Sequence, residues 1–222
     1  MIHELPSVEQ SYATELVRKS IHLCSLSIPL VYYWISKAQA LSILIPLALV
    51  LGVLDVARLY HPPTGRLYSK YLGFLLRPHE RTEHGRKLNG ATYVLLSAII
   101  CVLVFPKVIV ITAFAVLIIS DTSAALIGRR FGRHRFFNKS VEGTTAFVLS
   151  GFVVVALAPK VTWLPAEYAI GAVAVVLGAI VEASPIPLDD NLSIPISTGL
   201  AMWLLYVVIL PWVNVFALDR MF

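Results

Sequence analysis

Charged residues are scarce in this sequence. Asp, Glu, Lys and Arg make up 14% of its 222 residues, whereas a soluble domain carries about 25%. Hydrophobic residues make up 58%, and the mean hydropathy is +0.79. This composition argues against an ordinary soluble enzyme, and we expect no nucleic-acid partner. The length predicts a single domain, residues 1–222.

A cleavable signal and a disulfide framework are also missing. Residues 1–14 are polar, and the acidic Glu4 and Glu9 have the wrong sign for the start of a signal peptide. The only cysteines are Cys24 and Cys101. The topology predicted below places them towards opposite leaflets, beyond the ~7 Å limit of a disulfide. We therefore expect no bridge and no cysteine metal site.

Hydrophobic blocks recur along the whole chain. A helix needs ~20 apolar residues to cross the ~30 Å hydrocarbon core, and shorter blocks can extend through flanking Gly, Ser and Thr. We therefore predict an all-α, multi-pass membrane protein with about seven transmembrane helices. The blocks are 16–35, 40–56, 91–105, 108–119, 146–158, 169–181 and 194–215.

Basic residues gather in two connections between these blocks, 58–87 and 129–139, and at Arg18 and Lys19. Because short cytoplasmic loops carry an excess of Lys and Arg, the N-terminus and this face are predicted to be cytoplasmic. In a prokaryote the membrane would be the cell membrane. The first connection also contains an amphipathic segment, 65–76, typical of a helix in the headgroup plane. It would serve either as an anchor or as a gate for a lipid substrate.

Ionisable residues beside the apolar blocks fall on the predicted cytoplasmic side, and a charge at bilayer depth usually serves a purpose. Asp55 and Arg58 are spaced to neutralise one another. Another group falls within a ~100° arc of one helix; a snorkelling anchor explains part of it, but His22 lies too deep for that. The arc holds Glu15, Arg18, Lys19 and His22.

Two further motifs suit phosphate and metal. Asp121 shares a helix face with Gly128 and Gly132, a strip that permits close helix packing or a phosphorylated ligand against the backbone. Lys139 opens the run Lys-Ser-Val-Glu-Gly-Thr that leads into block 146–158. A helix N-terminus there would offer N–H groups and a positive dipole end to phosphate.

Carboxylates accompany these groups. Glu142 would be repelled by phosphate unless a divalent cation lay between them, and Mg²⁺ is usually held by one or two carboxylates plus substrate phosphates. Asp189 and Asp190 precede Ser193 and Pro195, which look like helix-start residues. Carboxylates for metal and cations for phosphate together suit phosphoryl or nucleotidyl transfer. The sequence has neither a Walker A motif nor GxGxxG.

The motifs resemble those of the CTP-dependent lipid kinases, which comprise dolichol kinase, phytol kinase and the fungal-type diacylglycerol kinase, and more distantly the CDP-diacylglycerol synthases. The resemblance implies a polytopic enzyme that moves the γ-phosphate of CTP onto a lipid hydroxyl with a divalent cation. It leaves open whether the acceptor is diacylglycerol or an isoprenoid alcohol. The matching stretches are 15–22, 88–93, 121–132, 139–144 and 189–195.

We assign roles on this basis. Metal ligands are expected among Asp121, Glu142, Asp189 and Asp190. Catalysis is assigned to Asp121, Asp190, Lys139 and His22, and the hydroxyl proton is accepted by Asp190 by preference, or by His22. Asn89 and Tyr93 are candidates for contact with the base or the lipid head. The residues expected to bind nucleotide or phosphate are Arg18, Lys19, Asn89, Gly128, Arg129, Gly132, Ser140, Gly143 and Thr144.

Two other functions stay open. A phosphatidate cytidylyltransferase would use the same kinds of residue but attack the α-phosphate. A proton-coupled transporter would spread ionisable residues through the depth of the bilayer, whereas here they collect near one face. The preference for CTP over ATP comes from the resemblance alone, and the oligomeric state is not indicated.

Overall fold

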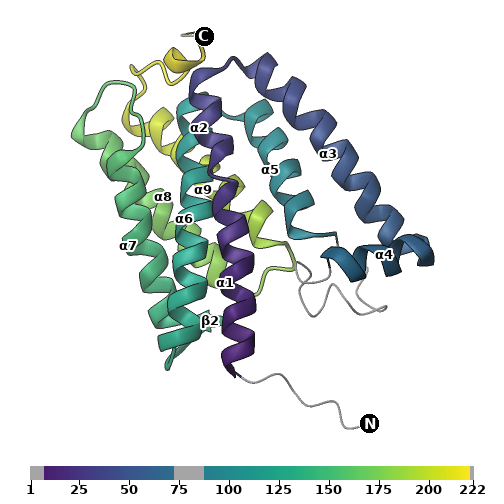
Figure 1. The fold of residues 1–222 in the computed structure, drawn as a ribbon. Coiled ribbons are helices and arrows are strands. Elements are labelled where there is room, and N and C mark those ends of the chain that lie inside the picture. The colour runs from purple at the N-terminus through teal and green to yellow at the C-terminus, as the bar shows by residue number, and fades with distance from the viewer. Residues whose placement is uncertain (1–7, 73–87, 221–222) are drawn as a thin grey trace.

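The structure, a computed structural model, describes residues 8–72 and 88–220 as a bundle of helices (Figure 1). The helices are α1 (Val8–Cys24), α2 (Ser27–Trp34), α3 (Lys37–Tyr60), α4 (Pro62–Leu72), α5 (Gly90–Val104), α6 (Lys107–Phe131), α7 (Val141–Leu157), α8 (Pro165–Ala183), α9 (Asp190–Ile209) and the short 3₁₀ helix η3 (Ala217–Arg220).

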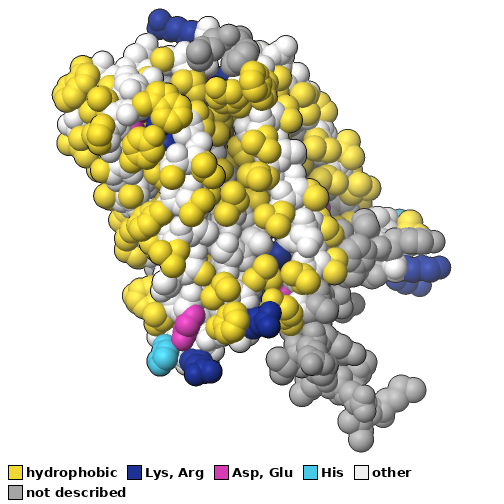
Figure 2. Space-filling view, turned by 60° about the vertical axis from the view of Figure 1, so that its left-hand side comes forward, with side chains coloured by type: hydrophobic (Ala, Val, Ile, Leu, Met, Phe, Trp, Pro, Cys, Tyr) yellow, Lys and Arg dark blue, Asp and Glu magenta, His cyan; other side chains and the backbone are white. Residues whose placement is uncertain are grey.

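Within residues 8–72 and 88–220, the four helices α3, α6, α8 and α9 are long and apolar enough to cross a membrane, and α5 and α7 are shorter apolar helices. Hydrophobic side chains cover most of the face seen in Figure 2, and charged side chains gather near its ends. These features indicate an integral membrane protein. The number of crossings and the face that meets the cytoplasm remain predictions.

Helix α6 lies at the centre of the bundle, and 78% of its most apolar 18-residue stretch is buried. Helix α3 lies at the edge, and only 22% of the corresponding stretch is buried. Helices α1 and α2 pack against α6 on one side, and α7 packs along it on another. A ligand that reached α6 would therefore be surrounded by segments distant in sequence.

The first predicted crossing, residues 16–35, is broken into α1 and α2. Ser25 N–H donates to the His22 carbonyl at 3.0 Å, and Leu26 N–H donates to the Leu23 carbonyl at 3.0 Å, so the chain tightens into a turn. Pro29 follows in the first turn of α2, where its missing N–H removes a bond back to Ser25 and is best tolerated. The prediction of one continuous helix was wrong because it overlooked this proline.

A short antiparallel hairpin joins α6 to α7. Strands β1 (Arg135–Phe136) and β2 (Lys139–Ser140) pair Arg135 with Ser140. Phe137, between them, adopts a left-handed conformation with φ 48°. This hairpin is a small exception to the all-α prediction, and it places Lys139 directly before α7.

The polar end of α3 is followed by α4, which runs crosswise to the long helices at the lower right of Figure 1. This placement agrees with a helix in the headgroup plane for residues 62–72. The remainder of the predicted segment, 73–76, lies outside the described residues. Both cysteines are free thiols, as expected.

Candidate active site

Helix α1 meets α6 through three ionisable side chains. The Lys19 ammonium donates to Asp121 Oδ2, and His22 Nε2 lies 3.6 Å from the same oxygen. Lys19 and Asp121 are both buried, with 2% and 6% of their surfaces exposed. The contact joins residues 102 positions apart, so the prediction that the arc of α1 shares a site with Asp121 agrees with the geometry.

Lys139 joins two further helices from the hairpin. Its ammonium donates to Glu182 Oε1 at 2.8 Å and to Asp190 Oδ2 at 3.0 Å. Burial lowers the pKa of Lys139, but the carboxylates of Asp190 and Glu182 outweigh burial and raise that pKa above its usual value. Lys139 is therefore a fixed positive charge at neutral pH.

The carboxylates of Asp121, Glu182 and Asp190 converge on one place, with one oxygen from each within 4.8 Å of the others. Glu182 is 3% exposed, and its Oε2 is buried without a hydrogen-bond partner among the described residues. An unsatisfied buried carboxylate oxygen is costly, so this atom is available to a ligand. Three oxygen donors of this kind suit a hard cation such as Mg²⁺.

A second ion-pair group flanks the carboxylates. Arg18 binds Glu15 through two hydrogen bonds, one of which is 3.1 Å from Nε to Oε2. Arg129 Nη2 lies 3.1 Å from the same Glu15 oxygen. Glu15 thus ties the end of α6 to α1 and holds two guanidinium groups near the site.

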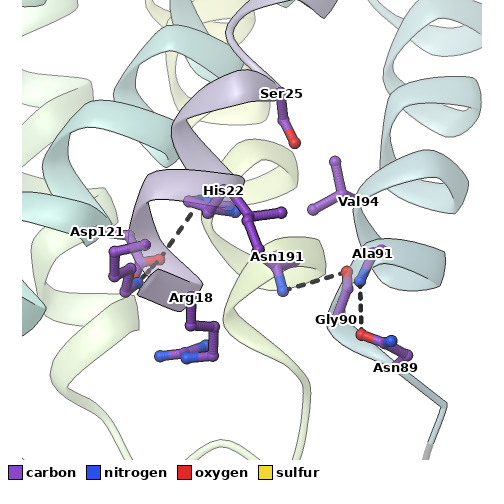
Figure 3. Close-up of a pocket in the computed structure, with 11 residues that line it drawn as sticks. Arg18, His22, Ser25, Asn89, Gly90, Ala91, Val94, Asp121 and Asn191 are labelled. Atoms are coloured by element: carbon purple, nitrogen blue, oxygen red, sulfur yellow. Dashed lines mark hydrogen bonds and ion pairs between the residues drawn. The ribbon is translucent and has the colours of Figure 1, made fainter. Parts of the chain in front are cut away.

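A polar pocket of about 100 Å³ opens between α1, α5, α6 and α9. In Figure 3 Arg18 and Asn89 lie at its lower end, Ser25 and Val94 lie at its upper end, and His22 and Asp121 lie on one wall. Ligand cavities usually measure about 300–1,000 Å³. A pocket of this size holds a hydroxyl-bearing headgroup or one phosphate, and it is too small for a whole nucleotide.

Asn191 of α9 also lines this pocket and lies between His22 and Gly90 in Figure 3. Its side-chain Nδ2 donates to Asp189 Oδ1 at 2.7 Å and lies 3.5 Å from the Gly90 carbonyl oxygen. Asp189 also accepts from Asn191 N–H at 3.0 Å and caps α9. The helix therefore begins at Asp190 rather than at Ser193, since Asp is a favoured N-cap residue. Capping also keeps Asp189 out of the carboxylate cluster, where a metal ligand was predicted.

Glu142 is likewise not brought to the cluster. Its Oε1 pairs with His134 Nδ1 at 2.8 Å across the hairpin, and His134 N–H donates to the same oxygen at 3.3 Å. The metal-ligand predictions for Glu142 and Asp189 therefore lack geometric support. Glu182 is the third carboxylate of the cluster instead. The only feature of the sequence that pointed to Glu182 is its position as an acid at the end of an apolar block.

The small-residue strip of α6 serves packing. A Cβ at Gly143 would meet the Ala124 carbonyl oxygen at 3.0 Å, and one at Gly128 would meet the Ser140 hydroxyl at 3.1 Å. Gly132 also faces Ser140, which caps α7 by accepting from Gly143 N–H at 3.1 Å. The close approach of α6 and α7 at Gly128 and Gly143 favours helix packing as the role of this part of the strip. Thr144 Oγ1 is buried without a hydrogen-bond partner among the described residues.

Asn89 and Asp55 organise the edge of the pocket. Asn89 caps α5 by accepting from Ala91 N–H at 3.2 Å, and its side chain donates to Tyr68 of α4 at 2.7 Å. Asp55 pairs with Arg58 at 2.7 Å, as its spacing predicted, and also accepts from Thr92 at 3.1 Å. Asn89 thus connects the crosswise helix α4 to the pocket.

Comparison with known proteins yields an uncharacterized protein of Rickettsia prowazekii, 25% identical over 190 residues, and several relatives that are named as lipid kinases. CTP-dependent diacylglycerol kinase 1 of Schizosaccharomyces pombe is 29% identical over 169 residues, 68% of this chain and 74% of that protein. The phytol kinase of Synechocystis sp. is 33% identical over 94 residues, 37% of this chain and 38% of that protein. Dolichol kinase of Schizosaccharomyces pombe is 36% identical over 94 residues, 39% of this chain and 17% of that protein.

No family model and no solved structure matches the chain. The relatives bear out the resemblance to lipid kinases, while the more distant resemblance to CDP-diacylglycerol synthases stays a prediction. The chain is thus a distant homologue of the CTP-dependent diacylglycerol kinases, the phytol kinases and dolichol kinase.

Proposed function

We propose that this protein is a membrane lipid kinase that transfers the γ-phosphate of CTP to the hydroxyl of a lipid alcohol. The observation that carries the proposal is the convergence of Asp121, Glu182 and Asp190 with Lys19 and Lys139, from five separate elements, beside a polar pocket. Phosphoryl transfer depends mainly on positioning and on neutralising charge, and this arrangement supplies both signs of charge at one place.

The carboxylates of Asp121, Glu182 and Asp190 would hold the divalent cation. Bound there, Mg²⁺ would neutralise charge on the triphosphate. Lys139 and Lys19 are the cations closest to these carboxylates, and they would bind phosphate oxygens once the metal shares the carboxylates. Arg18 and Arg129, held on Glu15, would add further positive charge at the entrance.

The lipid hydroxyl would occupy the polar pocket and attack the γ-phosphorus. An O–P bond forms to the lipid oxygen, the bond to the β–γ bridging oxygen breaks, and CDP leaves. Two groups are placed to take the hydroxyl proton. His22 lines the pocket and faces Asp121, and Asp190 accepts a hydrogen bond from Lys139. His22 is the closer of the two to the pocket and is our first choice as base.

The test is incubation of the purified protein with γ-labelled and, separately, α-labelled CTP, Mg²⁺ and a panel of lipid alcohols. The panel contains dioleoylglycerol, phytol and a long-chain polyprenol, with phosphatidate as the substrate of a cytidylyltransferase. Label from the γ position entering a lipid alcohol is the expected result. Label from the α position entering phosphatidate would replace the proposal with cytidylyltransferase activity, and label in no lipid would remove it.

The acceptor class and the nucleotide are parts of the same proposal. Relatives named for diacylglycerol, phytol and dolichol all carry out phosphorylation of a lipid. Competition of unlabelled ATP against γ-labelled CTP would establish the nucleotide preference. We expect ATP to compete at least tenfold less well than CTP.

A further inference from the structure

A long apolar groove runs between α2, α3 and α5. Its volume is about 390 Å³, within the range of about 300–1,000 Å³ that is usual for ligand cavities. Its lining is almost entirely hydrocarbon, and includes Ile28 and Val31 from α2 and Ala40, Leu44, Leu47 and Leu51 from α3. The groove is not filled by any described part of the chain. A hydrocarbon chain is the ligand that this apolar lining would bind.

The groove adjoins the polar pocket. Ser25, Ala91 and Val94 line both cavities. Figure 3 places Ser25 and Val94 at the end of the pocket away from Arg18. The turn between α1 and α2 falls at this junction, at Ser25. One ligand could therefore have a polar end beside Asp121 and His22 and an apolar end along α3.

The length of the groove fits a lipid chain. Along α3 its lining extends from Leu51 to Ala40, which at 1.5 Å per residue is about 17 Å. One leaflet of a ~30 Å hydrocarbon core is about 15 Å thick. The outer face of α3, where Leu49 is 63% and Val53 is 66% exposed, does not line the groove. The groove itself is open to the surroundings at Leu47, which is 46% exposed.

We propose that this groove binds the hydrocarbon chain of the lipid alcohol and so places its hydroxyl in the polar pocket. The proposal rests on the proposed function for the identity of the headgroup. It adds a subsite: α2 and α3 select the acceptor by the length and shape of its chain, while the carboxylate cluster acts on the hydroxyl. Binding is by burial of apolar surface, whose free energy rises by about 0.8 kcal/mol per CH₂.

A matched pair of variants tests this assignment. Leu47→Trp fills the groove, and Leu49→Trp adds the same bulk on the outer face of α3. Each is assayed with γ-labelled CTP on dioleoylglycerol and on the water-soluble dibutyrylglycerol, or on a long and a short isoprenoid alcohol if those are the acceptors. We expect Leu47→Trp to raise KM for the long-chain acceptor at least tenfold and to leave the short-chain acceptor within twofold.

Leu49→Trp should leave both acceptors within twofold of the unmodified protein. Equal effects of the two variants, or an equal loss on long and short acceptors, would overturn the groove assignment while leaving the kinase proposal standing. Unmodified protein that transfers no γ-label to any lipid would instead overturn the proposed function.

A second measurement does not depend on turnover or on the variants folding. The unmodified protein in vesicles is photolabelled with a lipid alcohol that carries a diazirine near the chain end, with and without excess unlabelled lipid alcohol. Competable labelling of residues 40–51 on the groove side and of α2 is expected. Labelling that is not competed, or that falls on the outer face of α3, would identify ordinary bilayer contact and overturn the proposal.

Discussion

The two ends of the bundle use buried charge differently. At one end, Lys139 lies between two carboxylates, and a Glu182 oxygen has no hydrogen-bond partner among the described residues. At the other end, Lys160 donates to the carbonyls of Val155, at 2.5 Å, and Ala158, at 2.7 Å. At the first end the charged side chains pair with one another and leave an oxygen for a ligand. At the second end the charged side chain hydrogen-bonds to backbone carbonyls.

Glu167 shows the same saturation. Its two oxygens accept from three backbone N–H groups at 2.8–3.1 Å, and also from the hydroxyls of Thr162, at 2.6 Å, and Tyr206, at 2.9 Å. A carboxylate with this many donors closes the loop between α7 and α8 and has no capacity left for a metal. Burial of an acid therefore does not identify a site. Glu182 differs from Glu167 because one of its oxygens has no hydrogen-bond partner among the described residues and because it converges with Asp121 and Asp190.

Asp121→Asn should give the largest effect. It keeps the shape of the side chain but removes the charge that faces Lys19 and the proposed metal. We expect the rate of γ-phosphate transfer to fall at least a hundredfold, with the monodisperse elution profile and thermal unfolding of the detergent-solubilised protein retained. Near-normal turnover would remove Asp121 from the active site.

Lys139→Met should cost about tenfold to a hundredfold in rate, because it removes the cation between Glu182 and Asp190. Lys160→Met is the matched control at the other end, and we expect its rate to change less than threefold. Steady-state assay of both variants measures the difference. A rate loss in Lys160→Met as large as that in Lys139→Met would contradict the division between the two ends.

The pKa of Lys139 gives this prediction a pH dependence. Because the folded pKa is raised above its usual value of 10.5, the stabilisation from its ion pairs is complete below about pH 10 and is lost only as pH rises through the raised pKa. The unmodified protein should therefore show no alkaline loss of stability from Lys139 between pH 7 and pH 10, measured by thermal unfolding across that range.

Glu182→Gln sharpens the comparison further. Removal of one of the three converging carboxylates should raise the Mg²⁺ concentration needed for half-maximal activity by about tenfold, with a smaller loss at saturating metal. Titration of activity with Mg²⁺ measures this shift. An unchanged Mg²⁺ requirement would show that Glu182 serves Lys139 alone.

Glu167→Gln should have the smallest effect on turnover, within about threefold. It should lower the free energy of unfolding by about 1–3 kcal/mol through loss of buried hydrogen bonds.

Glu142→Gln should leave the Mg²⁺ requirement within twofold, because Glu142 pairs with His134 outside the cluster. Thermal unfolding and the same Mg²⁺ titration check the two variants. A tenfold change in Mg²⁺ requirement in Glu142→Gln would restore its predicted place as a metal ligand.

Part of this site was predictable from the sequence. Asp121, Lys139 and Asp190 stand out because charged residues are costly beside apolar blocks, and they do converge. The structure does not bring Asp189 or Glu142 to the cluster, because Asp189 caps a helix and Glu142 pairs with His134. Glu182 was not among the predicted site residues, because one acid at the end of an apolar block has several ordinary explanations.

By itself, the sequence determined the membrane class, the positions of most helices and the set of polar residues that need partners, since these follow from hydropathy and from the cost of burying charge. Only the tertiary structure decided which of those residues meet. The pairing of Lys19 with Asp121 across 102 positions, and the junction of the polar pocket with the apolar groove at Ser25, depend on how the helices pack, and helix packing is not encoded in any single segment.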